Sequence, residues 1–306
     1  MRILVTGASG FLGRHLVPAL AGGHEVFATT RTGIASNKSG IRWLNADLAR
    51  LDDDWQFPPH VDAVLYMAQS RRYRDFPEAG ADMFGVNVHS LWRFVDYARR
   101  VGAGQFVFAS SANVYRPSSL PLNEEAAIDP TTFYATSKRI AEMILESYGA
   151  ELPTTILRLF TLYGPGQEDS LVTDLIDRVK KGRPVTLSGG CGPKFSPLYV
   201  TDACEAIKRV IERPPESAGA RHYNVGGIEE VSIRDFAEAI ALACGIDPMF
   251  EHRELEADAG WVVDGRRFAA ATGWAPETTL EDGLTRTVSG TRRSPASHEV
   301  DGGGRT

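Results

Sequence analysis

The sequence is poor in the features that mark several classes of protein. Its 306 residues include only 3 cysteines, and neither these nor the 7 scattered histidines follow the spacing of a zinc site, so no metal is expected. An odd number of unspaced cysteines is typical of reduced thiols in a cytoplasmic protein. The net charge of −6 offers no basic surface of the kind that binds nucleic acid.

Long apolar runs are also missing. No uncharged stretch is long enough to cross a membrane, and a core-like strand pattern begins at Arg2, so we expect neither a membrane span nor a signal peptide. The remaining composition, with 43% hydrophobic residues, is that of a soluble globular chain with one large domain or two small ones.

What the chain does have, near its start, is a glycine-rich turn. Residues 6–13 read Thr-Gly-Ala-Ser-Gly-Phe-Leu-Gly and follow an apolar run. A strand, a glycine turn and a helix in this order are typical of a dinucleotide-binding site. Gly7 permits the tight turn, Gly10 lets the backbone approach a pyrophosphate, and Gly13 lets the helix pack on the strand. The pyrophosphate would lie against free N–H groups of the helix. Ordinary strand–helix turns carry similar glycines, so a second motif is needed.

That second motif is Tyr-Ala-Thr-Ser-Lys at residues 134–138. Helix-start residues precede it and apolar residues follow it at helical spacing, so Tyr134 and Lys138 share one helix face. A nearby ammonium favours the phenolate and lowers the pKa of a tyrosine. A tyrosine tuned in this way exchanges protons with a sugar hydroxyl. The alternative is a surface tyrosine beside a solvated lysine, and the glycine turn upstream favours the catalytic pair.

A hydroxyl side chain is expected beside this pair. The buried-strand pattern at 105–109 ends in Ser110 and Ser111. The carboxyl ends of parallel strands face the ligand crevice, where a hydroxyl can hold the reacting oxygen. Ser111 is the better candidate because it lies further past the strand, and a polar turn without a catalytic role is the alternative.

Several further motifs follow in an order that points to one family. The chain resembles the extended short-chain dehydrogenases/reductases of the sugar epimerase/dehydratase type over about residues 1–290. Besides the glycine turn and the Tyr-x-x-x-Lys motif, the resemblance rests on Asp47-Leu48, Asn87-Val88, Ser-Ser-x-x-Val-Tyr at 110–115, Arg158 with Tyr-Gly-Pro-Gly-Gln at 163–167, Tyr199-Val200-x-Asp202, Tyr-Asn-Val-Gly at 223–226 and Gly273-Trp274-x-Pro276. These motifs are specific for the family and much less specific for the substrate.

The order of elements predicts an α/β fold, a doubly wound parallel sheet of the Rossmann type with right-handed crossovers. We expect strands at 2–6, 25–30, 41–45, 62–67, 105–110, 154–159 and 184–188, and helices at 11–22, 85–101, 132–149, 170–181, 201–212 and 232–244. By resemblance, residues 1–165 form the NAD(P)-binding domain with later elements from about 198–226, and 166–288 form a smaller interleaved substrate lobe. The composition of 289–306 predicts a disordered tail.

The choice of cofactor depends on the end of the second strand. An acid about 20 residues after the glycines would bind the ribose 2′-hydroxyl of NAD, but residues 28–31 read Ala-Thr-Thr-Arg. Arg31 can pair with a 2′-phosphate, so NADP is favoured over NAD. An arginine that stacks on adenine, compatible with NAD, is the alternative.

The resemblance assigns further residues to the dinucleotide. It implies that Asp47 contacts the adenine and that the segment Met67-Ala68-Gln69 lines the cofactor. The complete predicted cofactor set is Gly7, Ser9, Gly10, Phe11, Leu12, Gly13, Arg31, Asp47, Leu48, Met67, Ala68, Gln69, Asn87, Tyr134 and Lys138. The resemblance also implies a homodimer.

Departures from the family narrow the chemistry. Sugar dehydratases carry an Asp-Glu pair after the catalytic hydroxyl, but Ala112 and Asn113 stand there, so loss of water is not expected. The family's Asn before Tyr-Gly-Pro is Thr161, and the arginine that often grips a nucleotide diphosphate is Phe195, next to Lys194. A nucleotide-sugar substrate is still expected, with Ser111, Asn113, Thr161 and Lys194 as its binding residues.

Three functions fit these residues. An epimerase oxidises a sugar hydroxyl and returns the hydride to the other face, whereas a ketoreductase consumes NADPH at each turnover. Arg31 favours the reductase, and the whole motif set favours the epimerase. A sensor without turnover is disfavoured by the complete set of Ser111, Tyr134 and Lys138, because a sensor needs no proton donor.

Overall fold

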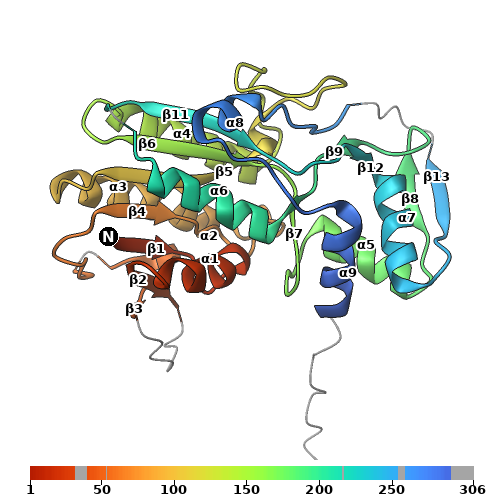
Figure 1. Ribbon diagram of the computed structural model, residues 1–306, viewed down its shortest axis with the longest axis horizontal. Coiled ribbons are helices and arrows are strands. Elements are labelled where there is room, and N and C mark those ends of the chain that lie inside the picture. The colour runs from red at the N-terminus through yellow and green to blue at the C-terminus, as the bar shows by residue number, and fades with distance from the viewer. Residues whose placement is uncertain (32–39, 53, 216, 254–258, 291–306) are drawn as a thin grey trace, which may run out of the picture.

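A seven-stranded parallel sheet forms the centre of the molecule. The computed structural model describes residues 1–31, 40–52, 54–215, 217–253 and 259–290 (Figure 1). The strands, in spatial order, are β11 (Ala220–Val225), β6 (Thr154–Leu159), β5 (Gln105–Ser111), β4 (Ala63–Tyr66), β1 (Arg2–Thr6), β2 (Glu25–Thr30) and β3 (Ile41–Asn45). Every neighbouring pair is parallel. The predicted doubly wound Rossmann sheet is therefore confirmed.

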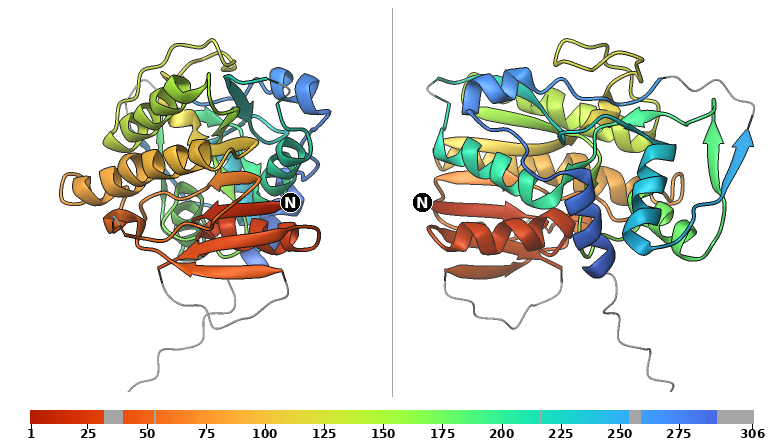
Figure 2. Two further views of the ribbon diagram at one scale, coloured as in Figure 1. Left: turned by 90° about the vertical axis from the view of Figure 1, so that its left-hand side faces the viewer. Right: turned by 45° about the vertical axis from the view of Figure 1, so that its right-hand side comes forward.

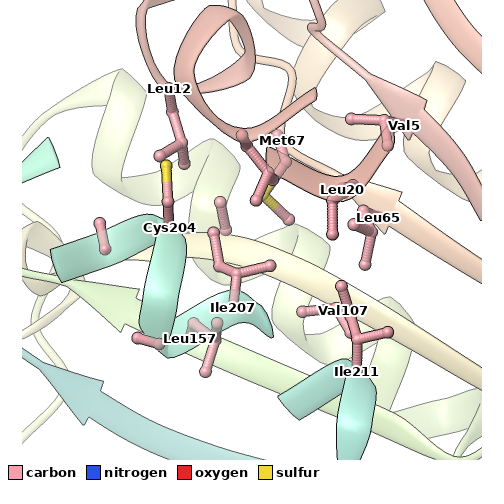
Figure 3. Packing of buried hydrophobic residues seen from close by; sticks show 14 of the residues in the cluster. Val5, Leu12, Leu20, Leu65, Met67, Val107, Leu157, Cys204, Ile207 and Ile211 are labelled. Atoms are coloured by element: carbon pink, nitrogen blue, oxygen red, sulfur yellow. The ribbon is translucent and has the colours of Figure 1, made fainter. Parts of the chain in front are cut away.

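Helices cover both faces of this sheet. The helices α1 (Phe11–Ala21) and α6 (Val200–Glu212) lie on one face, and α3 (Ser90–Arg100) and α4 (Phe133–Tyr148) lie on the other (Figures 1 and 2). Because successive strand residues point to opposite faces, Ile3 and Val5 of β1 join the core under α1 and α6, while Leu4 joins the core under α3 and α4. Figure 3 shows Ile207 and Ile211 of α6 packed toward the strands.

The helix predicted at 85–101 is interrupted. A short helix α2 (Gly80–Phe84) is followed by a π-helical turn at Gly85–His89, and only then does α3 begin. Gly85 lies so close to η1 (Leu48–Arg50) that a β-carbon on it would be 2.4 Å from the carbonyl oxygen of Ala49. In addition, the Tyr66 hydroxyl donates to the carbonyl of Val86 at 2.5 Å. The spacing of apolar residues within one segment cannot predict contacts of this kind with distant residues.

A smaller lobe, at the right of Figure 1, carries its own core. It contains α5 (Leu171–Lys180), β8 (Val185–Ser188), β9 (Lys194–Phe195), β12 (Val231–Ser232), α7 (Ile233–Cys244), β13 (Phe250–Arg253) and α9 (Leu280–Gly290). Ser170 and Ser232 start α5 and α7 with capping boxes. The strands β7 (Leu162–Tyr163) and β10 (Leu198–Tyr199) pair where the chain passes between lobe and sheet.

The sequence reading missed several elements of the second half. It gave no bounds for β11, β13, α8 (Arg266–Thr272) or α9. Ser289 and Gly290, predicted to begin a disordered tail, are the last residues of α9, which corrects that boundary; the rest of the predicted tail lies outside the described residues. The division into domains at residue 165 stays a prediction. No helix in the described ranges has the length and apolar character to cross a membrane.

Candidate active site

One cavity of about 560 Å³ gathers nearly all the predicted site residues. It lies where β1, β2, β4, β5 and β6 reach their carboxyl ends, as the crevice rule for open parallel sheets requires. Its lining includes Gly7, Ser9, Gly10, Phe11, Leu12, Gly13, Arg31, Asp47, Leu48, Met67, Ala68, Gln69, Ser111, Asn113, Tyr134, Lys138, Thr161 and Lys194. Residues from distant parts of the sequence therefore face the same space.

The glycine turn has the shape that a pyrophosphate needs. Gly7 adopts φ +67°, and a β-carbon on it would lie 2.8 Å from the Cα of Ala68. A β-carbon on Gly13 would lie 2.2 Å from the Gly7 carbonyl oxygen, so only glycine lets α1 pack this closely. Gly10 starts α1 without a side-chain cap, and the first residues of the helix, Phe11, Leu12 and Gly13, line the cavity, so their N–H groups are available to an anion there.

The part of the cavity next to the carboxyl end of β2 is polar. Thr29 and Thr30 are buried and Arg31 is exposed, and all three line the cavity. Across from them, the Asp47 side chain accepts a hydrogen bond from the Ala49 backbone N–H at 3.2 Å and so caps η1. These residues fit the adenosine half of a dinucleotide.

The opposite end holds the predicted reacting groups on α4. Thr132 caps this helix by accepting from the Ala135 N–H at 3.1 Å. The Lys138 side chain is 2% exposed, and its Nζ donates to the carbonyl oxygen of Ala109 at 2.8 Å. The Tyr134 hydroxyl donates to Gln69 Oε1 at 3.1 Å.

The charges of this pair differ from the sequence-based expectation. Burial lowers the pKa of Lys138 to about 7, and burial raises the pKa of Tyr134 to about 12, opposed by a hydrogen bond to Ser111. The expected lowering of the tyrosine pKa by the lysine is thus wrong for the protein without its ligands. Desolvation disfavours both charged forms at once and outweighs their attraction.

Asn87 is the one predicted cofactor residue that does not line the cavity. It is buried in the π-helical turn, where its Oδ1 accepts from the Ser70 N–H at 3.1 Å and its Nδ2 donates to Ser137 Oγ at 2.9 Å. Ser137 in turn donates to the carbonyl of Tyr134 at 2.7 Å. Asn87 therefore lies outside the cavity lining and connects the Ser70 backbone to the first turns of α4 through Ser137.

The part of the cavity near Tyr134 contains residues that the sequence reading did not assign. Tyr73, Gln167, Asp169 and Trp261 line it. The Tyr73 ring lies 5.3 Å from the Tyr134 ring, between centroids. Asp169 has φ +49°, rare for a residue other than glycine and common at functional sites. Gln167 ends the Tyr-Gly-Pro-Gly-Gln motif at 163–167, whereas Tyr73, Asp169 and Trp261 belong to no motif that the sequence analysis used.

Comparison with known proteins decides the family. The family model described as "NAD dependent epimerase/dehydratase family" matches residues 3–226. The chain belongs to this family. This membership makes it an NAD-dependent enzyme of the epimerase/dehydratase class, of the extended short-chain dehydrogenase type.

Relatives within this epimerase/dehydratase family match along their whole length. A probable UDP-glucuronate 4-epimerase of Rhizobium meliloti (strain 1021) is 27% identical, over 94% of this chain and 96% of the relative. A UDP-glucose 4-epimerase of Mycolicibacterium smegmatis is 29% identical, over 94% and 97%. The structure of MoeE5 with UDP-glucuronic acid and NAD is 26% identical with a TM-score of 0.81, over 95% and 99% of the two chains. The UDP-glucose 4-epimerase of Thermus thermophilus, in complex with NAD, is 27% identical with a TM-score of 0.78, over the same shares.

Proposed function

We propose that the chain is a UDP-sugar 4-epimerase, which inverts one sugar hydroxyl through a keto intermediate and ends each cycle with its cofactor unchanged. The observation that carries the proposal is that Ser111, Tyr134 and Lys138 line the same cavity as the glycine turn. The names of the related enzymes support the substrate class. Loss of water is disfavoured because Ala112 and Asn113 line the cavity where a dehydratase needs carboxylates.

The residues at the sugar end have distinct roles in this proposal. When bound, the dinucleotide supplies the hydride acceptor and donor. Tyr134 takes the proton from the sugar hydroxyl during oxidation and returns it during reduction. Ser111, which lines the cavity with Tyr134, holds the reacting oxygen. A protonated Lys138 one turn along α4 would favour the phenolate, whereas desolvation raises the pKa of Tyr134 to about 12 in the structure without ligands.

We further propose that NADP(H) binds more tightly than NAD(H). Arg31, with Thr29 and Thr30 beside it, lines the cavity where an acid would bind the ribose of NAD. A 2′-phosphate gives a guanidinium a charge-assisted partner. The related structures with NAD make NAD the competing assignment, and the two cofactors can be titrated directly.

The function is tested with purified protein, UDP-glucose and UDP-glucuronate as substrates, and each cofactor in turn. Formation of the C4 epimer without a net change in absorbance at the reduced-nicotinamide band supports the epimerase. Net loss of NADPH would instead show a ketoreductase, and no conversion of either sugar would contradict the proposal. Native mass spectrometry of the same sample identifies any retained cofactor and tests the predicted homodimer; the cytoplasmic location stays a prediction.

A further inference from the structure

The end of β5 is attached to one face of α4 by three successive contacts. Tyr134, Lys138 and Glu142 are spaced four residues apart and therefore lie along the same face of α4. Ser111 interacts with the Tyr134 phenol and lowers its pKa against burial, Lys138 donates to the carbonyl of Ala109 at 2.8 Å, and Glu142 accepts from Ser110 Oγ at 2.6 Å. The first two contacts involve proposed reacting groups, and the third extends the series into the core.

Glu142 is fully buried and completely hydrogen-bonded. Its side chain is 0% exposed. Oε1 accepts from Arg158 Nε at 2.9 Å in addition to Ser110, and Oε2 accepts from Arg158 Nη2 at 2.8 Å and from Arg139 Nη1 at 3.2 Å. The forked Arg158 pair fixes the orientation of the carboxylate, so the oxygen that holds Ser110 cannot turn away.

The same arginine continues into the neighbouring strands. Arg158 Nη1 donates to the Tyr115 hydroxyl at 2.7 Å, and Tyr115 donates to Asn224 Oδ1 on β11 at 2.8 Å. The Asn224 N–H donates to Glu124 Oε1 at 2.8 Å. Glu142 is thus the point at which a buried polar network reaches the helix of Tyr134 and Lys138.

We propose that Glu142 is a positioning residue for the reaction: it holds Ser110, and with it the strand end that presents Ser111, and it supplies the negative charge that balances Lys138. This inference rests on the proposed function. Ion-pair stability alone is a weak explanation for such a residue, because buried ion pairs gain little over well-packed apolar side chains. Its place one turn beyond Lys138 gives the charge a role in the site.

The surrounding charges are consistent with this role. Glu142, Glu146 and His222 bring potential ligand atoms within 4.8 Å of one another, but Arg139 and Arg158 already bind the Glu142 carboxylate, so we interpret the cluster as an ion-pair network rather than a metal site. His222 Nε2 lies 3.1 Å from Glu146 Oε1 without the geometry of a hydrogen bond.

Two pKa shifts connect the network to the site. Arg158 helps to hold the pKa of Glu142 below its ordinary value against the desolvation that raises it, so the carboxylate is charged. Glu142 in turn raises the pKa of Lys138 against the burial that lowers it to about 7. The other titratable groups that face Glu142 are Arg139 and Glu146 on α4, Arg158 on β6 and His222 on β11, and burial lowers the pKa of His222.

The test is Glu142→Gln, which keeps the shape and removes the charge. We expect kcat to fall about tenfold or more with KM changed less than threefold, and the alkaline limb of the pH–rate profile to move to lower pH, since Lys138 then loses its proton more easily. Glu146→Gln is the matched control, because Glu146 lies one turn further along α4, also pairs with Arg139 and makes no contact with Ser110. It should leave kcat and the profile unchanged.

Ser110→Ala keeps the proposal falsifiable if Glu142→Gln does not fold, because it leaves the Glu142–Arg158 pair intact. Ser110→Ala should lower kcat. Its melting temperature should fall less than that of Glu142→Gln. An unchanged kcat in Ser110→Ala overturns the proposal. So does a fall of activity in Glu142→Gln that only matches the loss of folded protein, with an unshifted pH profile.

A readout without turnover separates this inference from the proposed function. The pKa of Lys138 is measured by carbon-13 NMR of the lysine side chains, with its signal assigned by its absence in Lys138→Met. A lower Lys138 pKa in Glu142→Gln than in wild type or Glu146→Gln supports the charge-balancing role even if neither UDP-sugar is converted. An identical Lys138 pKa in all three contradicts it.

Discussion

Tyr73 donates a hydrogen bond to the backbone carbonyl of Asp169 across 2.5 Å, joining residues 96 positions apart. The bond connects the loop after β4 with the segment that leads into α5, and a second link, Arg74 to Asp174 at 2.8 Å, lies next to it in sequence. Because the Tyr73 ring also lies against Tyr134, the end of the cavity near Tyr134 is bounded by a contact between the sheet and the lobe.

Removing this bond should loosen the hold on the keto intermediate. In Tyr73→Phe the ring remains against Tyr134 while the donor to Asp169 is lost. We expect UDP-sugar turnover to leave reduced cofactor behind, because the oxidised sugar escapes before the hydride returns. Absorbance of reduced nicotinamide during turnover measures this. Arg72→Gln, an exposed change in the same loop, is the control, and an absence of reduced cofactor in Tyr73→Phe would show that the bond does not retain the intermediate.

Removal of the proposed proton-transfer group should abolish most of the activity. Tyr134→Phe is expected to lower kcat by about 10²–10⁴-fold while cofactor affinity is retained, because the ring still fills its place. Steady-state kinetics and a cofactor titration measure the two effects. Tyr148→Phe, an exposed-hydroxyl change at the other end of α4, should have no effect, and a near-normal rate in Tyr134→Phe would assign the proton to another group.

Cofactor selectivity should depend on Arg31. Arg31→Ala is expected to weaken NADP(H) binding by about 1.5–3 kcal/mol, the range for a hydrogen bond to a charged group, and to leave NAD(H) binding within a few-fold. Isothermal titration with both cofactors measures the change. Arg50→Ala, outside the cavity lining, is the matched control. Tighter binding of NAD(H) than NADP(H) by the wild type would refute the assignment.

The buried lysine should make stability depend on pH. Lys138 has a folded-state pKa of about 7 against 10.5 as its ordinary value, so between these values the unfolded chain binds more protons than the folded one. Stability therefore rises with pH through this window. Relative to Lys138→Met, the wild type should gain about 2 kcal/mol of unfolding free energy between pH 7 and pH 9, measured by urea denaturation. Parallel curves for the two proteins would show that the folded-state pKa is not lowered.

The parts of the fold that the sequence predicted are those with strong local signals. β1, β2, β3 and β6 occupy the predicted spans because each is a short run of mostly apolar or β-branched residues bounded by turns. β11 gave a weak signal because it is an edge strand whose first four residues are only half-buried. Gly85, the first residue of the π-helical turn, packs against Ala49, which is far away in the sequence.

In the candidate site, too, the residues with local sequence signals were predicted and those held by long-range contacts were not. Gly7 and Tyr134 were predicted because their motifs act through neighbours within one turn or one helix. The contacts of Tyr73 with Asp169 and of Ser110 with Glu142 join segments that only the folded chain brings together. The raised pKa of Tyr134 was missed for a related reason, since desolvation is a property of the assembled cavity and not of a spacing.

The position of β11 at the edge of the sheet also sets when the sheet can be completed. β6 pairs with β11 along its whole length, and Asn224 supplies the acceptor for the Tyr115 hydroxyl. A ribosome must therefore synthesise the chain through Val225 before the edge of β6 is covered and Tyr115 is satisfied. A fragment that ends at residue 165 would expose a bare strand edge, which invites aggregation. We therefore expect that residues 1–165 do not form a stable unit when cut out, because the strand that covers the edge of β6 follows α5, β8 and β9 in the chain.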